Sequence, residues 1–301
     1  MLREDDPSAV IRLLAKVERK LLYHHQWFVH MDRHGADPLC PDFSTGFDLI
    51  PPCDRFWADP FPWFHDERNF VFVEELPFST GKGHISVIEF DGYGRVERHL
   101  PVLTLPWHLS YPYLFDWDGE LWMLPEAGHS GRLTLYRCKA FPDRWEEAAV
   151  LLEGVRTVDP TLIAHDGRWW LFVNIAPVGA RIDDDLHLYF ADSPLGPFQP
   201  HPKNPVRTNP VGARPAGTPF WRDGVLYRPA QDCGVVYGLR TVVNRVTVMT
   251  TEAYAEVPFA AIEPGWKPGV LRTHTLSVRG DWRAVDALRC VPKWLQGRKN
   301  V

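Results

Sequence analysis

One motif recurs four times along this chain of 301 residues. Each copy contains a polar residue before a proline, an apolar stretch, a tight turn and a second apolar stretch. The prolines that open the copies are Pro60, Pro112, Pro160 and Pro215. A repeat of about fifty residues is typical of an array of similar supersecondary units. This periodicity restricts the fold more strongly than any other feature of the sequence.

The turns inside the copies predict β-hairpins. Asp118-Gly119, Asp166-Gly167 and Asp223-Gly224 each separate two apolar runs, and both central positions of such a turn favour positive φ. A third strand is expected after each pair, over the ranges His84–Phe90, Leu133–Cys138, Leu186–Phe190 and Val242–Met249. Many short strands with little helix between them predict an all-β fold.

A weaker fifth unit begins at Thr273-His274-Thr275, turns at Gly280 and returns through Trp282 to Leu288. It runs out of chain before it completes four strands. We expect the segment Gln26–His30 to supply the missing strand and so to close a ring. The sequence therefore predicts a five-bladed β-propeller over residues 25–301, folded as a single domain.

Residues 7–22 carry a different pattern. Ile11, Leu14, Val17 and Leu21 fall close to helical spacing, with charged residues between them. Pro7 suits the first turn of a helix. We expect residues 1–24 to form a helical extension that packs on the outside of the propeller or meets a partner.

The composition argues against several classes of protein. A net charge of −5 provides no basic footprint for nucleic acid. No stretch approaches the roughly 18 apolar residues of a membrane span, and the N-terminus lacks the apolar core of a signal peptide. The five cysteines form no Cys-x-x-Cys pair, which argues against a disulfide framework or a thiolate zinc site. We expect a cytoplasmic protein without metal or cofactor.

The residue that starts each inner strand of a propeller points toward one mouth of the central channel. Here these residues are Asp59, Tyr111, Asp159, Arg214 and His274. A purely structural ring has little need of such a set, so it predicts a ligand site. Structural alternatives stay open, because an aspartate before proline accepts turn hydrogen bonds and Arg214 could be a strut between Asp59 and Asp159.

A second group of polar residues lies where the second strands are expected to end. Its members are Glu74, Glu75, Glu126, Asn174, Gln231 and Asp232. The loops that carry Lys82 and His108 are expected to reach the same mouth. Two carboxylates in one cleft are the minimum for chemistry at a glycosidic bond. As alternatives, Glu126 could pair with an arginine and Lys82 could be solvated.

Several longer motifs carry a resemblance to a known family. They are Ala-Asp-Pro-Phe from Ala58, Lys-Gly-His-Ile-Ser-Val from Lys82, Ala-Arg-Pro-Ala-Gly from Ala213 and Arg-Pro-Ala-Gln-Asp-Cys from Arg228. From about Phe56 to Glu256 the chain resembles the N-terminal domain of glucosamine inositolphosphorylceramide transferases and its bacterial relatives. That domain is similar in fold to the five-bladed propeller glycosidases that act on arabinan, xylan and fructan. The resemblance implies a role in carbohydrate processing.

The resemblance also implies roles for the ring residues. In the propeller glycosidases the first and third blades carry the base and a modulator of the acid, which match Asp59 and Asp159. The fourth blade carries a glutamate as the acid, but the matching residue here is Arg214, which cannot give up its proton. His274 matches a fifth-blade histidine. The remaining candidates for the acid are Glu75, Glu126 and Asp232.

Three functions follow as expectations. The preferred one is glycosyl transfer from an activated or anionic sugar in glycan or glycolipid biosynthesis, with Asp59 as base and Arg214 as the clamp for the anion. The alternatives are hydrolysis of furanoside or acidic glycans, with Glu126 or Glu75 as acid, and a non-catalytic glycan-binding module. The expected partners are a carbohydrate or sugar-phosphate ligand and a protein of glycan biosynthesis. The residues expected to bind the ligand are Arg214, His274, Tyr111, His108, Lys82, Gln231 and Asp232.

Overall fold

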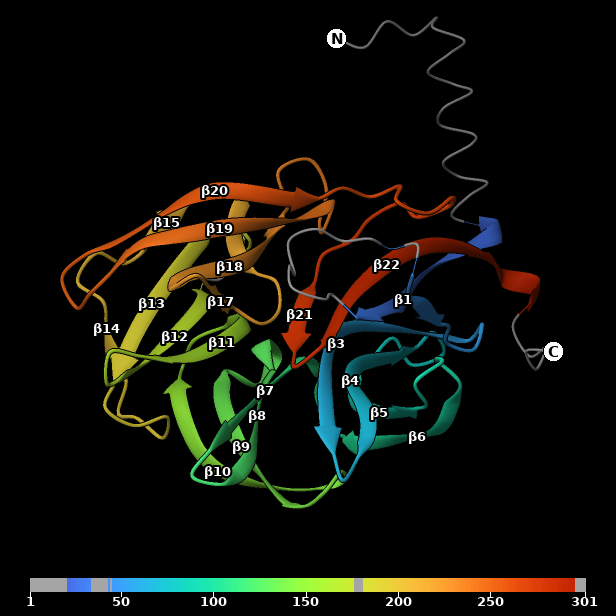
Figure 1. The fold of residues 1–301 in the computed structure, drawn as a ribbon, viewed down its shortest axis with the longest axis horizontal. Coiled ribbons are helices and arrows are strands. Elements are labelled where there is room, and N and C mark those ends of the chain that lie inside the picture. Colours follow the sequence, from blue (N-terminus) through green and yellow to red (C-terminus); the bar gives the residue numbers. More distant parts are fainter. Residues whose placement is uncertain (1–20, 34–42, 44, 176–180, 296–301) are drawn as a thin grey trace, which may run out of the picture.

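The computed structural model describes residues 21–33, 43, 45–175 and 181–295. Its strands form five antiparallel sheets arranged around a central axis (Figure 1), which is a five-bladed β-propeller. The predicted all-β fold is confirmed. The helix expected over residues 7–22 lies almost wholly outside the described residues, and the domain boundary after residue 24 stays a prediction.

Blades 1 to 4 each contain strands in chain order. Blade 1 consists of β3 (Arg55–His65), β4 (Arg68–Pro77), β5 (His84–Phe90) and β6 (Val96–Leu103). Blade 2 consists of β7 (Ser110–Trp117), β8 (Glu120–Glu126), β9 (Arg132–Ala140) and β10 (Arg144–Glu153). Blade 3 consists of β11 (Thr157–His165), β12 (Arg168–Ile175), β13 (Asp185–Ala191), β14 (Gln199–Pro200) and β15 (Arg207–Thr208). Blade 4 consists of β16 (Val211–Pro215), β17 (Phe220–Arg222), β18 (Val225–Asp232), β19 (Arg240–Met249) and β20 (Tyr254–Ile262). Two 3-10 turns, η1 (Gly128–Ser130) and η2 (Lys293–Leu295), complete the described elements.

Blade 5 joins the two ends of the chain. It contains β21 (Leu276–Arg279), β22 (Trp282–Pro292), β1 (Tyr23–Arg33) and β2 (Phe47–Leu49). Strand β1 pairs with β22 along its whole length, from Tyr23 opposite Pro292 to Arg33 opposite Trp282. The predicted closure by the segment Gln26–His30 is confirmed, and the pairing extends beyond that segment at both ends.

The inner hairpins have the predicted turn geometry. Both central residues have positive φ in Asp118-Gly119, at 52° and 73°, and in Asp166-Gly167, at 49° and 72°. The same holds for Asp223-Gly224, at 51° and 72°. Such turns follow the right-handed twist of the strands they connect, so the Asp-Gly pairs fix the hairpin ends of blades 2, 3 and 4.

The polar residue before the repeated proline forms a bulge in the first three blades. Asp59, Tyr111 and Asp159 have φ of 50°, 46° and 49°, and the register of each inner strand shifts at that residue. A left-handed backbone is uncommon outside glycine, and a bulge re-aims the side chain that carries it. In blade 4 the positive φ falls instead on Gly212, at 94°, two residues before Arg214.

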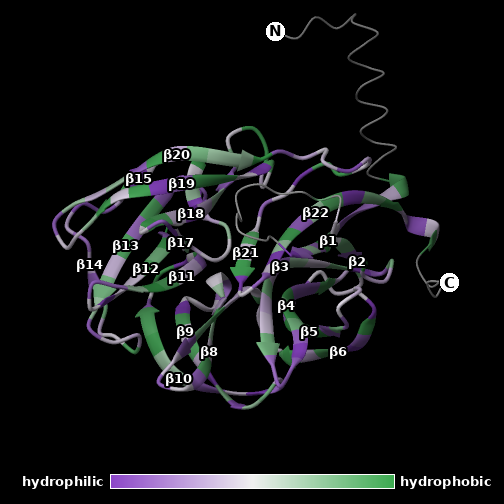
Figure 2. Ribbon diagram, viewed as in Figure 1, coloured by the Kyte–Doolittle hydropathy of each residue, from purple (hydrophilic) through white to green (hydrophobic). Residues whose placement is uncertain are grey.

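The apolar core lies between neighbouring blades. Its largest cluster joins blades 1, 2 and 3 and includes Phe61, Phe72, Tyr111, Trp122 and Leu171. Apolar segments appear in the strands of all five blades (Figure 2). Because each such side chain contributes about 1.5–3 kcal/mol on burial, these contacts hold the blades together and keep the inner strands in fixed positions.

Candidate functional site

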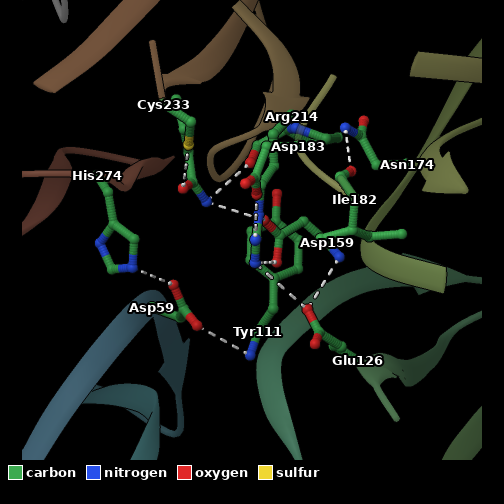
Figure 3. A network of polar contacts seen from close by, with 12 residues as sticks. Asp59, Tyr111, Glu126, Asp159, Asn174, Ile182, Asp183, Arg214, Cys233 and His274 are labelled. Carbon is green, nitrogen blue, oxygen red and sulfur yellow. Dashed lines mark hydrogen bonds and ion pairs between the residues drawn. The ribbon is translucent and has the colours of Figure 1, made fainter. Parts of the chain in front are cut away.

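The residues that start the five inner strands lie together at one end of the channel (Figure 3). Asp59, Tyr111, Asp159, Arg214 and His274 are all at most 8% exposed. Their contacts divide them into two groups, which we call the Asp159 cluster and the Asp59 cluster.

The Asp159 cluster contains Glu126, Asp159, Asp183, Arg214 and Gln231. Arg214 donates from Nε to Asp159 Oδ2 at 2.5 Å, from Nη2 to Asp159 Oδ1 at 3.3 Å and from Nη1 to Asp183 Oδ1 at 2.9 Å. Gln231 Nε2 donates to Asp159 Oδ2 at 2.8 Å. Glu126 Oε2 lies 3.7 Å from Arg214 Nη2. Asp183 is in the connection between β12 and β13, where the sequence motifs did not point.

Arg214 is therefore a strut, although not between the expected residues: it joins Asp159 to Asp183 and does not contact Asp59. Burial disfavours its charge, but Asp159, Tyr237 and Glu126 outweigh this and raise its pKa above the usual value. The Tyr237 ring covers the guanidinium, with its centroid 4.9 Å from Cζ. A leaving phosphate would have to compete with carboxylates for these donors.

The Asp59 cluster contains Asp59, His274, Thr275 and Asp286. Thr275 Oγ1 donates to Asp59 Oδ1 at 3.0 Å, and the backbone N–H of Tyr111 donates to Asp59 Oδ2 at 3.2 Å. Nε2 of His274 lies 3.6 Å from Asp59 Oδ1. The carboxylate of Asp59 is thus held by one blade on each side of its own.

The pKa of Asp59 is raised to about 7. Burial is the largest cause, and the charges of Glu74, Asp159 and Asp286 add to it, against the opposing effect of His274. A carboxyl group with this pKa changes its protonation state near neutral pH, which suits a catalytic base.

Asp286 on β22 is a site residue that the sequence reasoning missed. Its Oδ1 accepts the backbone N–H groups of His274, at 2.9 Å, and Thr275, at 3.0 Å, and its Oδ2 accepts that of Asp59, at 3.2 Å. Nδ1 of His274 lies 2.6 Å from Asp286 Oδ2. Burial opposes a charge on His274, but Asp286 and Asp59 outweigh it and raise the pKa of this histidine to about 9.

A metal ion does not fit this cluster well, although its geometry is compact. Asp59, His274 and Asp286 each place one ligand atom within 4.8 Å of the others. His274 already faces both carboxylates, with Nδ1 2.6 Å from Asp286 Oδ2 and Nε2 3.6 Å from Asp59 Oδ1. Asp286 already accepts three backbone N–H groups. We derive no chemical step through a metal.

Glu126 occupies the same place relative to Asp159 that Asp286 occupies relative to Asp59. Glu126 Oε2 accepts the backbone N–H of Asp159 at 3.2 Å, while Oε1 makes no hydrogen bond to the described residues. Burial, followed by the charge of Asp159, raises the pKa of Glu126 well above its usual value. The environment of Glu126 therefore favours its protonated form.

The strand register explains which second-strand residues reach the site. Glu74, Glu126 and Asn174 pair with Ala58, Ser110 and Val158, and each of these three residues directly precedes an inner-strand site residue. Successive side chains of a strand point to opposite faces. The residue that follows Glu74, Glu126 or Asn174 in the second strand is therefore directed away from the site.

This alternation separates Glu74 from Glu75. Glu74 Oε1 lies 3.1 Å from Nε2 of His108, at the rim of the site. Glu75 faces away and accepts hydrogen bonds from Trp57 Nε1 at 3.1 Å and Arg55 Nη1 at 2.5 Å, and it contacts His99.

The environment of Glu75 is the reverse of what a catalytic acid needs. Burial alone would raise its pKa, but His99, Trp57 and Arg55 outweigh burial and lower the pKa to about 2. Glu75 is therefore held as a carboxylate, which does not suit a proton donor.

Three other expected ligand-binding residues are engaged elsewhere. Lys82 Nζ donates to the carbonyl of Leu105 at 3.1 Å. Asp232 accepts Arg240 Nε at 2.9 Å. The hydroxyl of Tyr111 bonds to Thr161 Oγ1 at 2.8 Å and accepts the N–H of Gly217 at 2.7 Å. Tyr111 thus ties blades 2, 3 and 4 together.

His108 and Gln231 do reach the site. Nδ1 of His108 accepts the N–H of Gly83 at 2.9 Å, so Nε2 is the nitrogen that faces Glu74. The hydrogen bond to Glu74 raises the pKa of His108 above its usual value. Tyr237, which the sequence reasoning missed, stands edge-on to His274 with ring centroids 5.4 Å apart and so joins the two clusters.

Comparison with known proteins assigns the family. Residues 47–268 match the model of "Glucosamine inositolphosphorylceramide transferase 1, N-terminal". The chain belongs to this family. It is 37% identical over 212 residues to the Arabidopsis thaliana protein glucosamine inositolphosphorylceramide transferase 1, covering 68% of this chain and 28% of that protein. Identity to the protein of the same name from Oryza sativa subsp. japonica is 36% over 208 residues, with the same coverage.

Solved structures share the fold of this family member. A family-43 β-xylosidase/α-arabinofuranosidase from a compost microbial metagenome is similar with a TM-score of 0.56 and 12% identity, covering 79% of this chain and 91% of that chain. A family-117 glycoside hydrolase of Zobellia galactanivorans is similar with a TM-score of 0.53 and 14% identity, covering 88% and 90%. At these identities the likeness concerns the fold alone.

The chain spans 28% of the length of the curated relatives it matches. Among the described residues, no helix has the length and apolar character that crossing a membrane requires.

Proposed function

We propose that this chain is a carbohydrate-active enzyme whose channel mouth cleaves a glycosidic bond by acid–base chemistry. Asp59 is the base that activates the attacking hydroxyl group, and Glu126 is the acid that protonates the leaving oxygen. The attacking group is water or a sugar hydroxyl, so the same site serves hydrolysis and transfer to an acceptor.

One observation carries this proposal: two buried carboxyl groups, Asp59 and Glu126, are held by hydrogen bonds from neighbouring blades in one site. The pKa of Asp59 is about 7, while that of Glu126 is raised well above its usual value. Carboxyl groups whose pKa values are strongly perturbed within one site are candidates for acid–base roles. The free Oε1 of Glu126 is the atom available to donate a proton.

The similar proteins agree with a sugar as the substrate. The similar family-43 enzyme was solved in complex with xylotriose, and the curated relatives carry the name glucosamine inositolphosphorylceramide transferase 1. The half-exposed ring of Tyr237 offers an apolar face with a polar tip at the rim, a surface suited to sugars.

Transfer from a phosphate-activated sugar, with Arg214 as the phosphate clamp, is the less favoured version. Three of the N–H groups of Arg214 are bonded to Asp159 and Asp183. The surrounding carboxylates also repel a phosphate, because like charges disfavour each other at short range. The expected cytoplasmic location and the expected glycan-biosynthesis partner stay predictions.

A second candidate is a glycan-binding module without catalysis. It is favoured by the pairing of Arg214 with Asp159, because the arginine stands where the propeller glycosidases carry their acid and it neutralises a carboxylate of the site. This candidate predicts sugar binding without turnover in the wild-type protein.

The test combines substrate screening with isosteric variants. The wild-type protein is incubated with oligosaccharides and activated sugars, and products are read by mass spectrometry. For a substrate so found, Asp59→Asn and Glu126→Gln should each lower kcat by roughly 10²- to 10⁴-fold, which is the usual contribution of a general acid or base.

The matched control is Asp166→Asn, in the exposed hairpin turn at the other end of β11. It makes the same chemical change outside the site and should leave kcat unaltered. Full activity of Asp59→Asn would refute the assignment of the base. Binding of oligosaccharides without any product in the wild type would establish the second candidate.

A further inference from the structure

Blade 5 contains a cavity separate from the channel mouth. Its volume is about 460 Å³, and it lies between β1, β22 and the segment 267–271 that precedes β21. This volume is within the range of about 300–1,000 Å³ that is typical of small-molecule sites. Apolar walls come from Phe28, Pro268, Val270 and Leu271.

The half-buried guanidinium of Arg289 lines this cavity. Nε and Nη2 both donate to Oε1 of Gln26, at 3.1 Å and 2.7 Å, and the Phe28 ring lies 5.6 Å from Cζ. No described carboxylate forms an ion pair with Arg289, and its Nη1 makes no hydrogen bond to the described residues. Burial lowers the pKa of Arg289, and the nearby Cys53 and Asp48 offset this effect only in part.

Gln26 cannot take over the role of a counter-ion. Its Nε2 donates to the carbonyls of Pro52 and Arg55, both at 2.8 Å, which fixes its neutral amide with the oxygen toward Arg289. Buried or half-buried charges in proteins are ordinarily paired. Arg289 is therefore held in position with part of its charge uncompensated.

The other cation of the cavity is already neutralised. Lys267 forms an ion pair with Asp48, and Asp48 also lies 2.8 Å from Nδ1 of His30. The cavity thus presents one available positive charge, at Arg289, beside an apolar wall.

We propose that this cavity is a binding site for a small amphiphilic monoanion, an aliphatic chain that carries one carboxylate or phosphate head group. The head group pairs with Nη1 of Arg289, and the aliphatic part packs against Phe28, Val270 and Leu271. This site is independent of the chemistry proposed at the channel mouth.

Octanoate is the probe for the test, titrated into the full chain and followed by isothermal titration calorimetry. Octanol carries the same chain without the charge, acetate carries the charge without the chain, and octylammonium reverses the charge. We expect saturable binding of one octanoate per chain. Each of the three comparison ligands should bind at least about tenfold more weakly, since each lacks one of the two contacts.

Two variants of equal charge change identify the anchoring residue. Arg289→Gln should weaken octanoate binding by at least about tenfold, whereas Lys267→Gln in the same cavity should change it by less than about threefold. Arg289→Lys keeps the positive charge and should restore most of the affinity. Melting temperatures of all variants report whether each one folds.

The outcomes decide the proposal even if Arg289→Gln proves unstable. Equal affinity of wild-type protein for octanoate and octanol would overturn it, because the cavity would then select only for apolar character. Unchanged binding in Arg289→Gln would overturn the role of the guanidinium. Loss of binding in Lys267→Gln with retention in Arg289→Gln would overturn the proposal, because Lys267 and not Arg289 would then be the residue that binds the anion.

Discussion

Arg214 binds Asp159 through two hydrogen bonds, from Nε to Oδ2 at 2.5 Å and from Nη2 to Oδ1 at 3.3 Å. The two residues begin the inner strands of neighbouring blades, so this pair links blade 3 to blade 4 at the channel mouth. In the propeller glycosidases that the chain resembles, the fourth-blade position carries the acid. Here the residue at this position, Arg214, holds the third-blade carboxylate in place.

Replacing Arg214 with methionine should destabilise the fold strongly. Asp159 is 1% exposed, and removal of its partner leaves a buried carboxylate uncompensated, which costs about 3–5 kcal/mol. Urea unfolding gives the free energy of unfolding directly. The control is Arg168→Met, which breaks the exposed pair with Asp192 at 3.1 Å and should cost less than about 1 kcal/mol.

A double variant separates lost packing from the unpaired charge. Arg214→Met combined with Asp159→Leu removes both charges and should recover much of the lost stability, because replacing a buried ion pair with apolar residues is often neutral or stabilising. If the single variant unfolds no more easily than Arg168→Met, Arg214 is not the strut that its contacts describe.

The interaction of His274 with Asp286 should make stability depend on pH above neutrality. The folded-state pKa of His274 is about 9, against an unfolded value of about 6.5. A raised pKa means that the folded state binds the proton more tightly. Protonated His274 therefore adds about 3 kcal/mol to the free energy of unfolding, from the size of this shift. This stabilisation is complete below pH 6.5 and disappears as the pH rises through 9.

Urea unfolding of the wild type and of His274→Gln at pH 6 and pH 9.5 checks this dependence. The wild type should lose about 3 kcal/mol more than the variant over this interval, since only the wild type releases the proton. Parallel pH dependence in both proteins would mean that His274 does not carry the charge.

The sequence predicted the repeat elements well because their signals are local. Asp-Gly pairs mark hairpin turns through the backbone freedom of two residues, and an apolar run marks each buried strand. Ring closure was also predictable, since the fifth unit lacked a strand and Gln26–His30 was left over. The family resemblance agreed with the same architecture.

The site was harder to predict because it depends on register and on side-chain direction. Glu74 and Glu75 are neighbours in sequence, and only the pairing of Ala58 with Glu74 decides which one faces the mouth. The same rule does not find Asp286, because the register of blade 5 begins at Leu276, two residues after His274. Asp183 and Tyr237 lie in connections between strands, where no periodic signal marks them.

Replacing Glu75 with glutamine should affect stability and leave the chemistry intact. Glu75 has a folded-state pKa of about 2, against about 4.3 when unfolded, so its carboxylate contributes about 3 kcal/mol above the unfolded pKa. This contribution is lost as the pH falls through 2. Glu75→Gln should therefore unfold more easily at pH 7 while its kcat equals that of the wild type.

The comparison that matters for Glu75 is with Glu126→Gln, the same chemical change on the second strand of the next blade. That variant should keep its stability, because the raised pKa of Glu126 favours the neutral form that glutamine mimics, and it should lose turnover. A loss of kcat in Glu75→Gln at full stability would return Glu75 to the list of candidate acids.

The acid–base pair should produce a bell-shaped dependence of kcat/KM on pH. The rate should rise as the pH passes about 7, because Asp59 must lose its proton to act as base, and it should fall again at the higher pH where Glu126 loses the proton it has to donate. Asp59→Asn should remove the acidic limb together with most of the activity, and Glu126→Gln should remove the basic limb.

With a leaving group that needs no protonation, such as p-nitrophenol, Glu126→Gln should regain most of its rate while Asp59→Asn stays inactive. A wild-type profile that is flat between pH 5 and 8 would contradict the role of Asp59, because a base with a pKa of about 7 cannot act unchanged across that interval.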